Sequence, residues 1–186
     1  MHGQFNFWVL TQCADWRILR GMIEVAADVF VGNAGDFELV RADLEWAVLQ
    51  CAKEPWHREA LGYTSRGAPK THPEYLWAYR GNRLILNMVD APQAVFFNPS
   101  MINEGLNFVE QALREGKRVL IHCNQGNSRA PAMALLYMKR AGLVDGHYEQ
   151  ALAHFKTIYP DYEPGAGIDN YVKAEFGPKT ELEATG

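Results

Sequence analysis

The segment from Arg118 to Gly142 restricts the fold of this chain more than any other. It begins with a short apolar run, Arg118–His122, that is typical of a buried strand. A polar loop with a central glycine follows, and the chain then enters an apolar run, Ala130–Ala141, that is typical of a helix ended by Gly142. A strand that passes through a tight loop into a helix is the building unit of α/β folds, so we expect such a fold here.

The same alternation of strands and helices recurs on both sides of this segment. Leu84–Val89 is expected as a strand, and Asn98 followed by Pro99 predicts the start of a helix. Further strands are expected at Phe5–Leu10, Val25–Val31 and Ala47–Cys51, further helices at His147–Ile158 and Ile168–Phe176, and a short helix with Asp36 as its N-cap. The alternation predicts a single α/β domain over residues 1–186, with a mostly parallel central sheet and helices on both faces.

Segment 53–81 has the least regular pattern in the chain. It is rich in proline, glycine and aromatic residues, so we expect a loop-rich excursion over the sheet. The pattern is equally compatible with a loop that sets substrate specificity and with an insertion that has no such role.

The charge of the chain excludes some classes of partner. The formal net charge is −4, whereas a general binder of nucleic acids or of anionic membranes carries an excess of lysine and arginine. We therefore expect neither nucleic acid nor a membrane as partner. A small local pocket for an anion remains compatible with this charge.

The cysteines indicate the compartment. Cys13, Cys51 and Cys123 lie far apart and form no CxxC pair, so neither a disulfide framework nor a zinc site is predicted. No metal or cofactor is expected. A few separate thiols suit a reducing compartment, and the longest apolar run, Ala130–Met138, is too short to span a bilayer. A cytoplasmic location is the resulting expectation.

The loop between the strand and the helix has the residue types of a phosphate site. A loop that leads into a helix N-terminus directs backbone N–H groups toward one point, where the helix dipole adds positive charge. Arg129 offers a planar fork for two phosphate oxygens, and the same positive surroundings favour the thiolate of Cys123, which is the nucleophilic form. The expected phosphate-binding residues are Asn124, Gln125, Gly126, Asn127, Ser128 and Arg129.

The stretch His122-Cys123, five residues, then Arg129 resembles the signature of the protein tyrosine phosphatase superfamily, and HCNQGNSRAP is most similar to its dual-specificity branch. The resemblance implies a metal-independent phosphatase with a phosphocysteine intermediate on Cys123. It also implies an aspartate acid about thirty residues earlier, and Asp90 lies 33 residues before Cys123, directly after a predicted strand. His122 has the place of a supporting residue. The implied substrate is a phosphorylated protein carrying phosphotyrosine, with phosphoserine or phosphothreonine as further candidates.

One position departs from the family pattern. The residue after the arginine is usually serine or threonine, whose hydroxyl is thought to assist departure of the cysteine sulfur in the second step, and here it is Ala130. We therefore predict slow hydrolysis of the intermediate and a burst of first product. Ser128 is a candidate to supply the missing hydroxyl.

Two other functions fit parts of the pattern. A phosphate-recognition module with weak or no activity would retain the loop, and Ala130 would be the first sign of lost catalysis. A sulfur carrier of the rhodanese kind also uses a cysteine loop before a helix, but it needs neither Arg129 nor Asp90.

Overall fold

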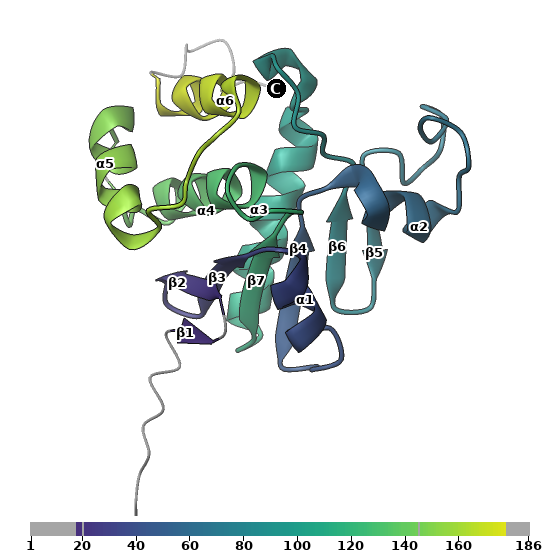
Figure 1. The fold of residues 1–186 in the computed structure, drawn as a ribbon, viewed down its shortest axis with the longest axis horizontal. Helices are drawn as coiled ribbons and strands as arrows, with labels where there is room; N and C mark the ends of the chain where they lie inside the picture. Colours follow the sequence, from purple (N-terminus) through teal and green to yellow (C-terminus); the bar gives the residue numbers. More distant parts are fainter. Residues whose placement is uncertain (1–17, 20, 145, 178–186) are drawn as a thin grey trace, which may run out of the picture.

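A computed structural model describes residues 18–19, 21–144 and 146–177 of the chain. Seven strands form one sheet in the order β1-β2-β3-β7-β4-β6-β5 (Figure 1). The central strands β3, β7, β4 and β6 are parallel, whereas β1, β2 and β5 pair antiparallel at the edges. The strands are β1 (Ile18–Leu19), β2 (Met22–Ala26), β3 (Val29–Gly32), β4 (Trp46–Gln50), β5 (Trp77–Arg80), β6 (Arg83–Leu86) and β7 (Arg118–His122).

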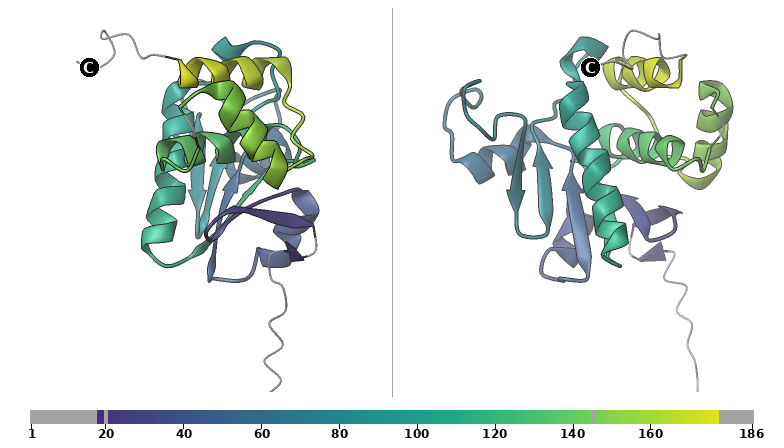
Figure 2. Two further views of the ribbon diagram at one scale, coloured as in Figure 1. Left: turned by 90° about the vertical axis from the view of Figure 1, so that its left-hand side faces the viewer. Right: turned by 180° about the vertical axis from the view of Figure 1, so that it is seen from behind.

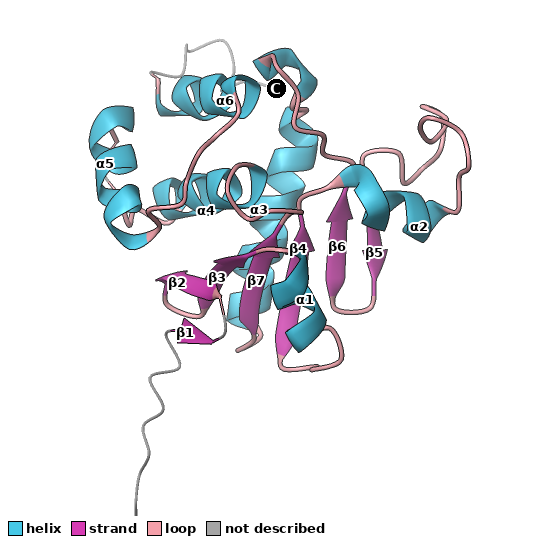
Figure 3. Ribbon diagram, in the orientation of Figure 1, coloured by secondary structure: helices cyan, strands magenta, loops and turns pink. Residues whose placement is uncertain are grey.

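Helices cover both faces of this sheet, as predicted. Helix α1 lies on one face, and α3 crosses the other, which is clear when the molecule is turned around (Figures 1 and 2). Figure 3 shows that α4 lies beside β7 and β3, whereas α5 and α6 lie farther out, packed against α4. The helices are α1 (Ala34–Val40), η1 (Lys53–His57), α2 (Arg58–Leu61), η2 (Ala94–Phe96), α3 (Pro99–Arg114), α4 (Arg129–Arg140), α5 (Tyr148–Ile158) and α6 (Ala166–Phe176). None of the helices in the described part of the chain combines the length and the apolarity needed to cross a bilayer.

Strand β7 and helix α4 form the centre of the core. Val119, Leu120 and Ile121 of β7 are fully buried, because β7 lies between two parallel neighbours and has helices on its faces. Every residue of α4 from Ala130 to Met138 is buried as well. The two ends of the loop between them are therefore held by two buried elements.

Two predictions near the N-terminus are wrong. Val25–Val31 is not one strand: β2 and β3 form an antiparallel hairpin, and the chain turns at Asp28, which has a φ of 60°. An aspartate tolerates this left-handed conformation better than most residues do. Asn33, not Asp36, is the N-cap of α1. Its side chain accepts from the Asp36 amide, and the Asp36 carboxylate accepts from the Asn33 amide, which is a capping box.

The other predicted elements are present in the described part of the chain, most of them with shifted boundaries, whereas β1, β5, η1, α2 and η2 were not predicted. Strand β6 ends at Leu86, three residues earlier than the predicted end at Val89. Segment 53–81 contains η1, α2 and the edge strand β5, and its residues Trp56 and His57 are buried. The predicted strand Phe5–Leu10 and Cys13 lie outside the described residues.

Candidate active site

Cys123 follows the C-terminal end of β7, and the loop after it runs directly into α4. The amide of Gly126 donates to the Cys123 Sγ atom over 3.3 Å, so the loop curls back over the sulfur. Gly126 has a φ of +84°, and a Cβ there would lie 3.0 Å from the carbonyl oxygen of Gly32. The tight curl therefore requires a glycine, as the sequence predicts.

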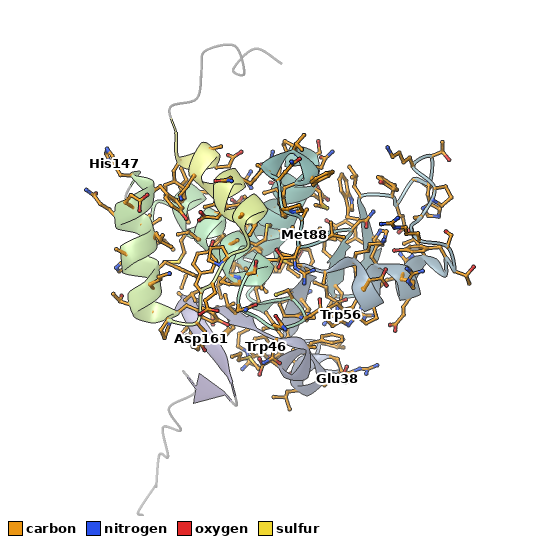
Figure 4. All side chains as sticks on the ribbon, turned by 45° about the horizontal axis from the view of Figure 1, so that its top comes forward. Glu38, Trp46, Trp56, Met88, His147 and Asp161 are labelled. Atoms are coloured by element: carbon orange, nitrogen blue, oxygen red, sulfur yellow. The ribbon has the colours of Figure 1, made fainter. Side chains whose placement is uncertain are left out.

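Three carbonyl groups of the loop are held from outside by other parts of the chain. The donors come from the start of α1 and from the connection between α5 and α6, in which Asp161 is labelled in Figure 4. The bonds are Ala34 N to Asn124 O at 3.2 Å, Tyr159 Oη to Gly126 O at 3.0 Å and Glu163 N to Asn127 O at 2.8 Å.

These outer bonds orient the loop's amides. In a trans peptide the carbonyl group and the following N–H point in opposite directions. The outward carbonyls therefore direct the N–H groups of Gln125, Asn127 and Ser128 toward the inside of the loop, where Gly126 already meets the sulfur. Converging amides at the start of α4 form a site for an anion.

The guanidinium group of Arg129 lies beneath this loop. One terminal nitrogen donates to Asn124 Oδ1 at 3.0 Å, and the other donates to the carbonyl oxygen of Met88 at 3.2 Å. Met88 is buried near the middle of the molecule (Figure 4). The Arg129 side chain is only 13% exposed, so its charge is directed toward the loop and away from bulk solvent.

Asp90 lies beside the loop although it is distant in sequence. Its Oδ2 atom lies 3.8 Å from Arg129 Nε, and its Oδ1 atom accepts a hydrogen bond from Ser128 over 3.3 Å. Ser128 in turn accepts from the amide of Gly165 over 3.1 Å. The single hydroxyl hydrogen of Ser128 is thus used by Asp90. Ser128 does not supply the Cys123 sulfur with a hydroxyl donor, contrary to the alternative that the sequence left open.

His122 supports the loop from below. Its ring is stacked on Phe37, with centroids 5.0 Å apart, and meets the edge of Trp56 at 4.6 Å. Its Nδ1 atom lies 3.4 Å from the Cys123 carbonyl oxygen, and its Nε2 atom lies 3.1 Å from Gln50 Nε2. Burial lowers the pKa of His122 to about 4, so the ring is neutral at physiological pH.

Comparisons with known proteins show which fold this chain has. No family model matches the chain. Among solved structures, the human tyrosine phosphatase-like serine/threonine/tyrosine-interacting protein superposes with a TM-score of 0.58 at 20% identity, over 84% of this chain and 95% of its own. Human DUSP28 superposes with a TM-score of 0.56 at 19% identity, over 86% of this chain and 94% of its own. DUSP15 superposes with a TM-score of 0.58 at 16% identity, over 89% of this chain and 97% of its own.

Curated proteins with similar sequences have related names. Dual specificity protein phosphatase 1 of Arabidopsis thaliana is 38% identical over 36% of this chain, and mouse Dual specificity protein phosphatase 12 is 25% identical over 76%. The matches span only 32% and 41% of the lengths of these two relatives. This chain has a dual-specificity phosphatase fold. The fold that the sequence resemblance implied is thereby confirmed.

Within the dual-specificity phosphatase fold, the sequence did not predict the residues that hold the loop and Asp90 in place. Gln50 contacts His122, and Tyr159 donates to the carbonyl oxygen of Gly126. Gly165 lies against Asp90. Burial raises the pKa of Tyr159 to about 12, so its hydroxyl stays protonated and donates. No local pattern distinguishes these residues, because a lone buried glutamine, tyrosine or glycine also fits an ordinary core.

Proposed function

We propose that this chain is a metal-independent phosphatase of phosphorylated proteins that works through a phosphocysteine intermediate. The observation that supports this proposal most strongly is the convergence of three chemical groups on one loop. The sulfur of Cys123 accepts from a loop amide, Arg129 lies beneath the same loop, and the carboxylate of Asp90 lies 3.8 Å from that guanidinium group. A nucleophile, a cation for the phosphoryl oxygens and an acid are the groups that the reaction needs.

The proposed first step transfers the phosphoryl group to the enzyme. The Cys123 thiolate attacks phosphorus while the inward amides and Arg129 hold the non-bridging oxygens. The bond between phosphorus and the bridging oxygen breaks, and Asp90 gives its proton to that oxygen. The product alcohol or phenol leaves, and phosphocysteine remains.

The proposed second step releases phosphate. Asp90, now a carboxylate, takes a proton from water, and the water oxygen attacks phosphorus. The sulfur leaves as a thiolate, so the starting state returns. Ala130 is fully buried and has no hydroxyl to stabilise the departing sulfur, which supports a slow second step.

The substrate class follows from the charge around the loop. Asn124, Gln125 and Asn127 are uncharged, whereas a phosphoinositide or a triphosphate would be bound better by additional cations. We therefore propose a phosphoprotein substrate with phosphotyrosine, and with phosphoserine or phosphothreonine as further candidates. The cytoplasm is the proposed location, because an attacking thiolate needs a reducing compartment.

A phosphate-recognition module is the second candidate, since one structural neighbour is named a phosphatase-like interacting protein and Ala130 departs from the family pattern. Turnover of a small aryl phosphate from pH 5 to pH 8 separates the two candidates. We expect turnover by the native chain, none by Cys123→Ser, and a loss of about 10²- to 10⁴-fold in Asp90→Asn. The control is Cys51→Ala, which removes another buried thiol outside the loop and should retain activity.

Binding of inorganic phosphate without turnover in the folded native chain would favour the recognition module. Thiosulfate sulfurtransfer by Cys123 would instead favour the sulfur carrier. Capture of a phosphoprotein on Cys123→Ser or Asp90→Ala would identify the substrate.

A further inference from the structure

Gln50 makes a polar contact that the proposed reaction does not yet use. It is the last residue of β4, and the parallel register pairs it with His122, the last residue of β7. Both side chains are fully buried, and their Nε2 atoms lie 3.1 Å apart. Phe37 and Trp56 make aromatic contacts with the ring, and Gln50 provides the polar contact at Nε2.

The two contacts of the imidazole determine which nitrogen carries the hydrogen. Nδ1 lies 3.4 Å from the carbonyl oxygen of Cys123, and a carbonyl oxygen only accepts, so Nδ1 must be the N–H. The neutral ring then has a lone pair on Nε2. That lone pair accepts from the Gln50 amide N–H at 3.1 Å, and both contacts are satisfied.

The opposite orientation of the Gln50 amide satisfies only one contact. If Oε1 faced His122, Nε2 would have to carry the hydrogen, and the Nδ1 lone pair would then oppose the Cys123 oxygen. In the observed orientation Gln50 Oε1 is buried without a hydrogen-bond partner in the described part of the chain. An apolar side chain of similar size would avoid that unpaired oxygen, so packing alone does not explain an amide at this position.

We propose that Gln50 is a positioning residue that holds His122 in the Nδ1–H tautomer and thereby fixes the backbone of Cys123. In this tautomer the positive end of the imidazole dipole points toward the carbonyl group of Cys123, and positive charge close to this residue favours its thiolate. In the other tautomer a lone pair would face the Cys123 carbonyl oxygen and move it. The link to catalysis rests on the proposed function, whereas the tautomer can be tested without any substrate.

Imidazole ¹⁵N chemical shifts and long-range ¹H–¹⁵N correlations of the full chain test the tautomer directly. We expect His122 to show a protonated Nδ1 and an unprotonated Nε2, and Gln50→Met to lose this preference, because methionine matches the length of glutamine but cannot donate. A protonated Nε2 in the native chain would overturn the proposal. So would an unchanged tautomer in a folded Gln50→Met variant.

The effect on the nucleophile is measured by the pH dependence of Cys123 alkylation by iodoacetamide, with the modified peptide identified by mass spectrometry. We expect Gln50→Met to move the midpoint upward by about one pH unit, which is about tenfold in the thiolate-to-thiol ratio. In the background of His122→Phe the same substitution should cause no further shift, because Gln50 acts through the imidazole. A purely structural role would lower the melting temperature and leave the midpoint in place.

The two proposals fail in different ways. A native midpoint near that of a free cysteine would contradict the proposed phosphatase mechanism, whatever Gln50 does. A low native midpoint that Gln50→Met leaves unchanged would overturn the role of Gln50 and leave the phosphatase proposal standing.

Discussion

The hydroxyl of Ser128 donates to the Oδ1 atom of Asp90 over 3.3 Å and accepts from the Gly165 amide over 3.1 Å. This chain of hydrogen bonds connects the end of the Cys123 loop, the proposed acid and the residue that precedes α6. Asp90 is 41% exposed, so these contacts hold a carboxylate that solvent can also reach. Its position therefore depends on contacts with Ser128, and through Ser128 on the Gly165 amide.

Ser128→Ala removes the hydroxyl from this chain. We expect the rate with phenyl phosphate to fall about tenfold, because a poor leaving group needs a correctly placed acid. The rate with a nitrophenyl phosphate, whose leaving group needs less protonation, should change little. The ratio of the two rates is the measurement, and an unchanged ratio would contradict the role of Ser128.

Gly165→Ala tests the same carboxylate from the other side. An added Cβ would lie 2.7 Å from Asp90 Oδ1, so Asp90 must move. We expect selective loss of activity toward poor leaving groups, again by about tenfold. Gly146→Ala is the matched control, because a Cβ at Gly146 meets no atom within 4 Å. An equal loss of activity toward poor leaving groups in the two variants would contradict this prediction.

Ala130→Ser restores a hydroxyl in the first turn of α4. We expect a higher steady-state rate and a smaller burst of first product, because the departing thiolate gains a donor. Rapid mixing with an aryl phosphate measures both quantities. Ala132→Ser is the control, since Ala132 is equally buried in α4. A native time course without a burst would count against a slow second step.

Gly126→Ala should destabilise the fold and reduce activity. Gly142→Ala is a suitable comparison, because Gly142 also has a positive φ, of +69°, but its added Cβ meets no atom within 4 Å. The backbone strain alone costs about 1–2 kcal/mol. At Gly126 the contact with the Gly32 carbonyl adds to that cost. Urea unfolding measures the difference, and equal losses of stability would show that the loop tolerates the contact.

The buried His122 should make stability depend on pH. Its pKa falls from 6.5 to about 4 on folding, so the unfolded chain binds a proton first as the pH decreases. The stability that the neutral His122 ring contributes is therefore fully present above pH 6.5 and is lost as the pH falls toward 4. The total loss is about 3 kcal/mol of unfolding free energy.

Urea unfolding of the native chain and of His122→Phe at pH 7 and pH 4.5 measures this effect. The native chain should lose more stability between the two pH values. Asp36 has a pKa raised by burial, which acts in the opposite direction, but it is present in both proteins and cancels in the comparison. Parallel losses in the two proteins would contradict the prediction.

The sequence by itself determined the strand, loop and helix around Cys123 and Arg129, including the need for glycine at position 126. These features depend on residues within a few positions of one another, so local periodicity and spacing encode them. Asp90 could be named from the sequence only through the family resemblance. Its contact with Arg129 depends on how the chain folds.

Tertiary structure alone decided the surroundings of these residues. Gln50 meets His122 because β4 pairs with β7, and Tyr159 reaches Gly126 because the chain after α5 returns to the loop. The hairpin of β2 and β3 likewise replaces a single predicted strand. Such contacts join residues far apart in sequence, and they form only when the order of strands and the packing of helices are set. No local pattern contains that information.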